Sequence, residues 1–211
     1  MAGKTAYPVR NVQELVDIMR EIDRINPLVR LMLDVEARTG LRNIDTRNLT
    51  WSTIMINGVI RESFTIVQSK GYRKRLTNGA QDANAKKAAS LTIDVNDELR
   101  TLFEEIHEIT GKHKLLFQSS HHHAKPNSPI TIQYVNRVLK RVALKLRLPY
   151  QLSTHSMRKS FTAMILSIPG ANISNAMELL GHSDLSSTQR YVNTFDNKNK
   201  DFTSQITYSV Y

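Results

Sequence analysis

The sequence contains no cysteine, and no apolar run in it reaches the roughly 20 residues that a membrane-spanning helix needs. Without cysteine there is no disulfide framework and no thiolate metal site, which suits a reducing cytosol. Residues 1–8 also lack the apolar stretch of a signal peptide. These absences predict a soluble cytoplasmic protein with no membrane partner.

Acidic residues are scarce relative to basic ones: the chain has 19 Asp and Glu against 29 Lys and Arg, a formal net charge of +10. Such an excess attracts anions and favours nucleic acid or an anionic membrane surface as a partner. A basic fold with neither partner has the same composition. Charge therefore narrows the class of partner without naming the chemistry.

The spacing of apolar residues predicts a mainly α fold with a small antiparallel β-sheet (α+β), in one domain without repeats or linkers. Stretches rich in β-formers at 51–56 and 63–68 flank the turn signal Asn57-Gly58 and predict a hairpin, and residues 89–93 would return along the same sheet. Helices are predicted over 11–25, 27–39, 96–110 and 131–147, and over a short segment ending at Gly181. Another helix should run from Thr154 to the break at Pro169-Gly170, with Phe161, Met164, Ile165 and Ile168 buried.

Two basic segments are candidates for DNA binding. The segment 70–87 is predicted to be a long mobile loop, and basic residues also repeat every four positions along the helix 131–147. Both patterns are equally consistent with a solvated surface and with contacts to a phosphate backbone. The candidate residues are Arg73, Lys74, Arg75, Lys86 and Lys87 in the loop and Arg137, Arg141 and Lys145 on the helix.

Three consecutive histidines, His121, His122 and His123, raise the question of a metal site. Adjacent residues of a regular element cannot all face one ion, and no carboxylate or cysteine stands at ligand spacing. We therefore expect no metal site, and a metal nuclease is the weakest of the functional alternatives.

The segment 155–191 concentrates groups that can act on a phosphodiester. His155 and Arg158 are three residues apart, so they project from one face of a helix. His182 and Tyr191 follow, and a capping box formed by Ser186 and Gln189 would place the tyrosine in the second turn of a final helix. Arginine stabilises charge on phosphate oxygens, and tyrosine can attack the phosphorus covalently. Each group alone is common, so the ordered set carries the interpretation.

That set resembles the catalytic domain of the tyrosine recombinase (phage integrase) family over about residues 12–195. The matching residues are T-G-L-R at 39–42 with Asp45, H-S-M-R at 155–158, L-G-H at 180–182, and Tyr191 nine residues after His182. The resemblance implies that Arg42 and Arg158 clamp the scissile phosphate, while His182 hydrogen-bonds one of its oxygens. Tyr191 would attack to give a 3′-phosphotyrosine and a free 5′-hydroxyl, without a metal or another cofactor.

The resemblance also implies supporting roles. His155 would be a hydrogen-bonding and proton-transfer partner, Asp45 would brace an arginine or histidine, and Lys70 would protonate the leaving 5′-oxygen. The segment after Lys70 is longer and more basic than is usual in the family, so Lys86 or Lys87 could take its place. A second departure is Lys159, where the family often has histidine.

The resemblance leads us to expect a bacterial or phage-encoded, nucleoid-associated protein made of a single catalytic domain, 1–211, with a tail at 196–211. The family's N-terminal core-binding domain would be absent, as in an excised catalytic fragment or a short inversion-type recombinase. The tail would pack either on its own chain or on a neighbouring protomer.

The expected function is site-specific recombination of double-stranded DNA, with integration, excision and inversion all open. A homo-tetramer would act on two DNA sites, and the chain alone could be a monomer. The same chemistry would serve telomere resolution or relaxation of the type IB topoisomerase kind. A non-catalytic DNA-binding module of the same fold is the other alternative.

Overall fold

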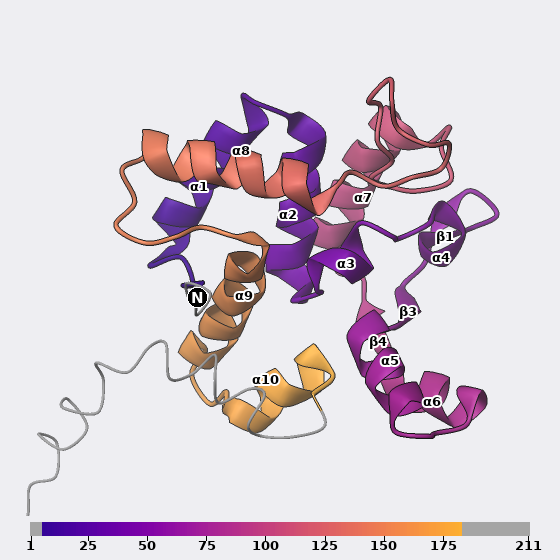
Figure 1. Cartoon of the computed structure of the whole chain (residues 1–211). Coiled ribbons are helices and arrows are strands. Elements are labelled where there is room, and N and C mark those ends of the chain that lie inside the picture. Colours follow the sequence, from indigo (N-terminus) through magenta and orange to yellow (C-terminus); the bar gives the residue numbers. More distant parts are fainter. Residues whose placement is uncertain (1–5, 183–211) are drawn as a thin grey trace, which may run out of the picture.

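The computed structural model of the chain describes residues 6–182. Its main body is built from the helices α1 (Val12–Asp23), α2 (Pro27–Thr39), α7 (Asp97–Thr110), α8 (Ile132–Lys145) and α9 (Thr154–Ser167). In Figure 1, α8 crosses α1 and α2, and α9 descends beside them toward α10 (Ile173–Leu180). The predicted helices are confirmed to within two residues at most ends, and the mainly helical fold with small antiparallel sheets is confirmed.

Capping residues define α2, the helix that leads into the candidate site. The side chain of Asn26 accepts a hydrogen bond from the amide of Val29, and Pro27 occupies the first turn, where its missing N–H costs nothing. The helix ends at Gly40, which adopts φ +65°. A Cβ at Gly40 would also lie 2.5 Å from the ring of Phe161, so both the backbone angle and the packing require glycine. This sharp end places Arg42 next to α9.

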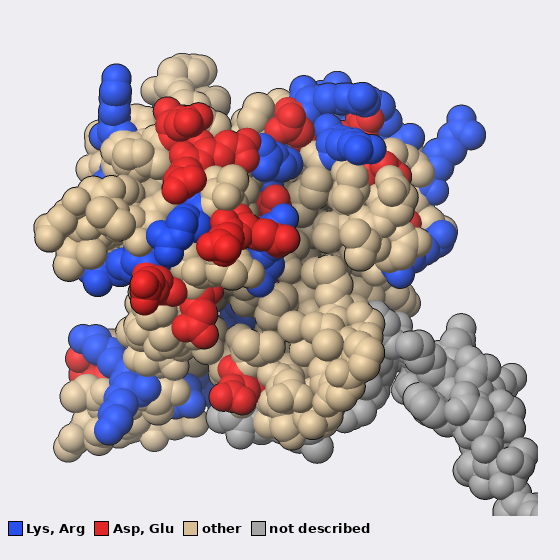
Figure 2. Space-filling model, turned by 180° about the vertical axis from the view of Figure 1, so that it is seen from behind, with Lys and Arg blue, Asp and Glu red and all other residues tan. Residues whose placement is uncertain are grey.

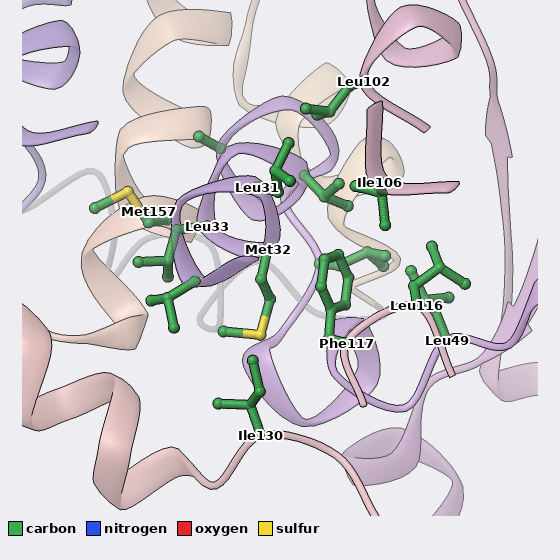
Figure 3. Close-up of a cluster of buried hydrophobic side chains, with 14 of the residues drawn as sticks. Leu31, Met32, Leu33, Leu49, Leu102, Ile106, Leu116, Phe117, Ile130 and Met157 are labelled. Carbon is green, nitrogen blue, oxygen red and sulfur yellow. The ribbon is translucent and has the colours of Figure 1, made fainter. Parts of the chain in front are cut away.

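The hydrophobic core surrounds α2. Leu31, Met32 and Leu33 are completely buried, and Figure 3 shows them between side chains of α7, α9 and the segments around Leu49, Phe117 and Ile130. Met157 belongs to the same cluster and is completely buried. Each such side chain contributes about 1.5–3 kcal/mol of burial free energy. Because Met157 lies between His155 and Arg158 in the sequence, this packing fixes the first turn of α9 against α2.

The predicted hairpin between 51–56 and 63–68 is wrong. Trp51–Ile54 is a helical turn, α4, and the turn Asn57-Gly58 joins only β1 (Met55–Ile56) to β2 (Val59–Ile60). Trp51 is buried, and its indole N–H donates to the carbonyl of Thr110 at 3.2 Å. This tertiary contact outweighs the local preference of the segment for a strand.

The longer stretch, β3 (Ser63–Val67), pairs instead with β4 (Ser90–Asp94). The two strands are antiparallel, with Ser63 opposite Asp94 and Val67 opposite Ser90. Residues 89–93 therefore return along the stretch 63–68, as predicted. Among the described residues they form a separate two-stranded sheet rather than a third strand of one sheet.

The segment predicted as a mobile loop contains two helices, α5 (Ser69–Thr77) and α6 (Asp82–Ala89). They pack against each other and project beside β3 and β4 in the lower right of Figure 1. Ala85 and Ala89 are buried, and the turn between the helices contains Gly79 at φ +83°. The polar composition suggested a loop, but alanine and lysine are good helix formers, and the two buried alanines give α6 an inner face.

After α9, the chain turns at Pro169-Gly170 and forms α10, which ends at Gly181 with φ +60°. Ile168 is 54% exposed rather than buried as predicted, because α9 ends at Ser167, and Met164 and Ile165 are only partly buried. No described helix is both long and apolar enough to cross a bilayer. The predicted capping box at Ser186 and Gln189, Tyr191 and the tail 196–211 lie outside the described residues.

Candidate active site

Arg158 is the centre of the candidate site. Its side chain is only 1% exposed, and its guanidinium donates hydrogen bonds to the carbonyls of Gly40 and, at 3.0 Å, Leu180. It also lies 2.8 Å from Nε2 of His182. A guanidinium can only donate, so this contact requires a neutral His182 with its proton on Nδ1. The structure therefore brings Arg158 and His182 together and fixes both to the backbone ends of α2 and α10.

Arg42 reaches the same point from the start of α3 (Asn43–Thr46). Its guanidinium donates to Oε1 of Gln68, a side chain that is 3% exposed. The amide nitrogen of Gln68 in turn donates to the carbonyl of Leu180 at 2.9 Å. Leu180 thus accepts from both Arg158 and Gln68, and this shared carbonyl links the two arginines.

Sequence reasoning did not identify Gln68. A buried glutamine directly before Ser69 and Lys70 has no distinctive spacing, and its partners come from segments 26 and 112 residues away. The neighbouring Gly181 gives an indirect signal. A Cβ at position 181 would lie 2.5 Å from Nε2 of Gln68, and the backbone there has φ +60°. Both the packing of Gln68 and the backbone angle therefore require glycine in the middle of the L-G-H motif.

Asp45 supports the site differently from our expectation. Its carboxylate is buried and accepts a hydrogen bond at 2.9 Å from the backbone amide of Ser69, and within residues 6–182 it accepts none from an arginine or histidine. The first amides of a helix have no partner inside the helix, so a carboxylate there fixes where the helix begins. Asp45 therefore positions the start of α5, one residue before Lys70.

His155 lies in the first turn of α9 and remains accessible to solvent. Partial desolvation lowers the pKa of its imidazole most, followed by the positive charges of Lys70, Arg158, Lys159 and Arg42. Since Lys70 and Arg42 act on the same ring, the predicted catalytic residues from α3, α5 and α9 face one region. The lowered pKa keeps His155 neutral near pH 7, the form that can accept a proton.

Lys159, the departure from the family pattern, points away from this chemistry. Its side chain is buried, and its ammonium donates to the carbonyl of Ala6 at 2.7 Å. The next residue, Ser160, accepts from the amide of Val9 at 2.9 Å. Both contacts tie the segment before α1 to the helix that carries His155 and Arg158.

The candidate DNA-binding residues are not equivalent. Arg73, Lys74 and Lys87 are exposed on α5 and α6, whereas Arg75 donates to the carbonyl of Gly71 at 3.1 Å and Lys86 forms an ion pair with Asp82 at 2.7 Å. Figure 2, which shows the molecule from behind, has basic side chains gathered at the lower left over these helices. The positive surface of this projecting pair is therefore carried mainly by Arg73, Lys74, Lys87 and Lys70.

The stripe on α8 is also uneven. Arg141 is exposed, and Arg137 lies 5.8 Å from the centre of the Tyr134 ring. Lys145 forms an ion pair with Glu21 of α1, which offsets its charge. The three residues therefore do not form a uniform row of available cations.

The rings of His121, His122 and His123 lie near one another, with centroids of neighbouring rings 4.5 Å and 4.0 Å apart. Across residues 6–182, however, no group of histidine, aspartate or glutamate side chains is arranged to hold a metal ion.

A sequence profile of the Phage integrase family matches residues 8–198. Among characterised relatives, the tyrosine recombinase XerD of Halalkalibacterium halodurans is 26% identical over 199 residues, which cover 93% of this chain and 59% of XerD. The chain thus spans less than two thirds of that relative's length.

Solved structures share the fold. The XerH site-specific recombinase bound to its palindromic difH substrate has a TM-score of 0.64 at 19% identity, covering 98% of this chain and 54% of XerH. The catalytic domain of bacteriophage HP1 integrase has a TM-score of 0.58 at 20% identity, and the match covers 96% of both chains.

Proposed function

The chain belongs to the phage integrase family, and from that membership we propose that it is a site-specific DNA recombinase that cuts and rejoins strands through a phosphotyrosine. We propose that residues 12–195 act as one catalytic domain. The observation that carries the proposal is the linked pair of arginines, with Arg158 buried and Arg42 joined to it through Gln68 and the carbonyl of Leu180.

Two fixed guanidinium groups suit a phosphodiester in its transition state. Arginine can donate two parallel hydrogen bonds to phosphate oxygens, and it keeps its charge at any physiological pH. Because their positions are set before the substrate arrives, little reorganisation is needed as negative charge develops on the phosphate. His182, next to Arg158, would hydrogen-bond the same oxygens.

Tyr191, nine residues after His182, would attack the phosphorus. A bond from its phenolic oxygen to phosphorus forms as the bond to the 5′-oxygen breaks, and His155 takes up the phenolic proton. Lys70 would give a proton to the leaving 5′-oxygen, a step worth about 10²–10⁴-fold in rate. Rejoining is the reverse reaction, in which a 5′-hydroxyl attacks the phosphotyrosine.

Lys70 is a better candidate for that acid than Lys86. The charge of Lys70 acts on His155, whereas Lys86 is held by Asp82, and this contact raises the pKa of Lys86. Lys87 stays an alternative on α6. The exposed cations on α5 and α6 would follow the DNA backbone beside the scissile phosphate.

The partner that we propose is double-stranded DNA, as in the XerH complex with difH. The assembly would be a homo-tetramer on two DNA sites. Integration, excision and inversion all use this chemistry, and so does telomere resolution, which would be recognised by hairpin products.

The test is to incubate the chain at low salt with a nicked suicide duplex, with and without EDTA, and to look for a covalent adduct on a denaturing gel. We expect an adduct that is insensitive to EDTA, lost in Tyr191→Phe and retained in the control Tyr7→Phe, because Tyr7 lies on the surface. The absence of any adduct, or the same adduct from Tyr191→Phe, would overturn the proposal. DNA binding without an adduct would identify a non-catalytic module, and cleavage that requires metal would identify a nuclease.

A further inference from the structure

Glu36 is a completely buried carboxylate that the proposed reaction does not use. It lies on α2, and its own backbone carbonyl accepts a hydrogen bond at 2.9 Å from the amide of Gly40, the residue whose carbonyl in turn holds Arg158. Burying an ionised carboxylate costs several kcal/mol, unless other groups compensate it. A buried glutamate at this place therefore calls for an explanation.

The hydrogen bonds of Glu36 connect it to the turn that carries Arg42. Asn43 is the residue after Arg42, and its side-chain nitrogen Nδ2 donates a hydrogen bond to Oε1 of Glu36 at 2.7 Å. The remaining oxygens of this pair, Oε2 of Glu36 and Oδ1 of Asn43, are both buried and accept no hydrogen bond from residues 6–182. Both are acceptors, so the pair lacks a donor, and a proton on the carboxyl group would supply one.

The charges around Glu36 come from two sides. Arg158 on α9 and Arg47 at the end of α3 favour its ionised form, and Asn43 does so through its hydrogen bond. The charged groups of α1 and α7 that reach α2, including Asp23, Glu98 and Glu105, pair with Arg30 and Arg38 on its outer side. Burial outweighs the arginines and raises the pKa of Glu36 well above its usual value of 4.5.

We propose that Glu36 is a positioning residue of the phosphate clamp, and that it acts through Arg158 and Asn43. When it is protonated, Glu36 still accepts the hydrogen bond from Asn43 in the turn that carries Arg42, and the positive charge of Arg158 attracts the phosphate without opposition from Glu36. Without the proton, the negative charge of Glu36 partly neutralises the positive charge of Arg158 and repels the incoming phosphodiester. Binding of the phosphodiester and ionisation of Glu36 are then antagonistic, and each shifts the other by the same factor. The inference rests on the proposed function, since it takes a phosphodiester as the ligand of Arg158.

The variant Glu36→Gln tests this because it keeps the size of the side chain and an oxygen for Asn43 but cannot ionise. Its matched control is Glu104→Gln, an exposed glutamate on α7. Both changes are made in a Tyr191→Phe chain, so that binding of an uncleaved duplex can be measured by fluorescence anisotropy from about pH 5.5 to about pH 9. We expect equal Kd values for the parent and Glu36→Gln at the acid end. Toward the alkaline end, the Kd of the parent should exceed that of Glu36→Gln by about tenfold, the change that one pKa unit represents.

A Kd ratio that does not change with pH, or weaker binding by Glu36→Gln at every pH, would overturn the inference. A second measurement does not depend on the variant: the unmodified chain should take up protons on binding duplex toward the alkaline end of this range, measured by calorimetry in two buffers of different ionisation enthalpy. No proton uptake would also overturn it. Failure of the proposed function looks different, because the unmodified chain would then form no covalent adduct with the suicide duplex.

Discussion

Gln68 offers the sharpest test of how the two arginines are held. The substitution Gln68→Ala removes the acceptor of Arg42 and the donor to the carbonyl of Leu180. Leu180 keeps its bond from Arg158, so its buried carbonyl still has a partner. The main loss is therefore the anchor of Arg42.

The magnitude follows from these hydrogen bonds. A hydrogen bond to a charged group contributes about 1.5–3 kcal/mol, so we expect Gln68→Ala to lower the free energy of unfolding by about 2 kcal/mol. The effect on cleavage should be of a similar size, because misplacing a catalytic group by about 1 Å costs up to the order of 10²-fold in rate. We expect single-turnover formation of the covalent adduct to fall by about 10–100-fold.

Two further variants separate position from charge. Gln68→Glu still accepts from Arg42, but it places a carboxylate against the carbonyl of Leu180 and neutralises the arginine, so it should also slow the reaction. Gln133→Ala, on the exposed side of α8, is the matched control and should change neither quantity. Unfolding in urea and adduct formation on a suicide duplex are the assays. A folded Gln68→Ala chain that cleaves at the unmodified rate would refute the role of Gln68.

Three other predictions concern Asp45, the basic helices and His155. Asp45→Ala should loosen the start of α5 and slow adduct formation, whereas Asp45→Asn should retain most of the rate because its amide oxygen still accepts from Ser69; equal losses would contradict this. Changing Arg73 and Lys74 to glutamine should reduce the slope of log K for DNA binding against log salt by about 0.9 for each phosphate that the variant no longer neutralises. Lys86→Gln should change this slope less, because Lys86 is already paired with Asp82. The lowered pKa of His155 means that protonation of its ring is disfavoured in the folded chain. The rate should therefore begin to fall only below pH 6.5, the ordinary pKa of histidine. The stability that the neutral ring contributes above pH 6.5 should likewise be lost as the pH falls from there toward the lower pKa of the folded chain. An acid limb centred at or above the ordinary value would contradict the assignment, and Lys159→Met should move the limb upward.

Local signals predicted most of the helices and the order of the site residues. Pro27 and Gly40 mark the ends of α2 by rules that involve only neighbouring residues, and the structure uses both of them in that way. The spacing of His155 and Arg158 places them on one helix, and the packing of Met157 fixes its position. These features could be predicted because their causes lie within one turn of helix.

The features that sequence could not predict depend on distant contacts. Residues 51–54 of the strand predicted at 51–56 form α4 instead, because Trp51 packs against His107 and donates a hydrogen bond to the carbonyl of Thr110. The segment after Lys70 has the composition of a loop because the buried face of α6 consists of only two alanines. Gln68 and Glu36 show no motif, and their roles appear only when α2, α3, α5 and α10 are brought together.

In the proposed reaction, Tyr191 becomes covalently joined to the 3′ end of the cut strand. The most direct test is to trap the adduct on a suicide duplex, digest the DNA and the protein, and identify the nucleotide-bearing peptide by mass spectrometry. The proposed reaction predicts a single modified residue, Tyr191, linked to a 3′-phosphate, with a free 5′-hydroxyl on the released strand. Linkage through another residue, or to a 5′-phosphate, would contradict it.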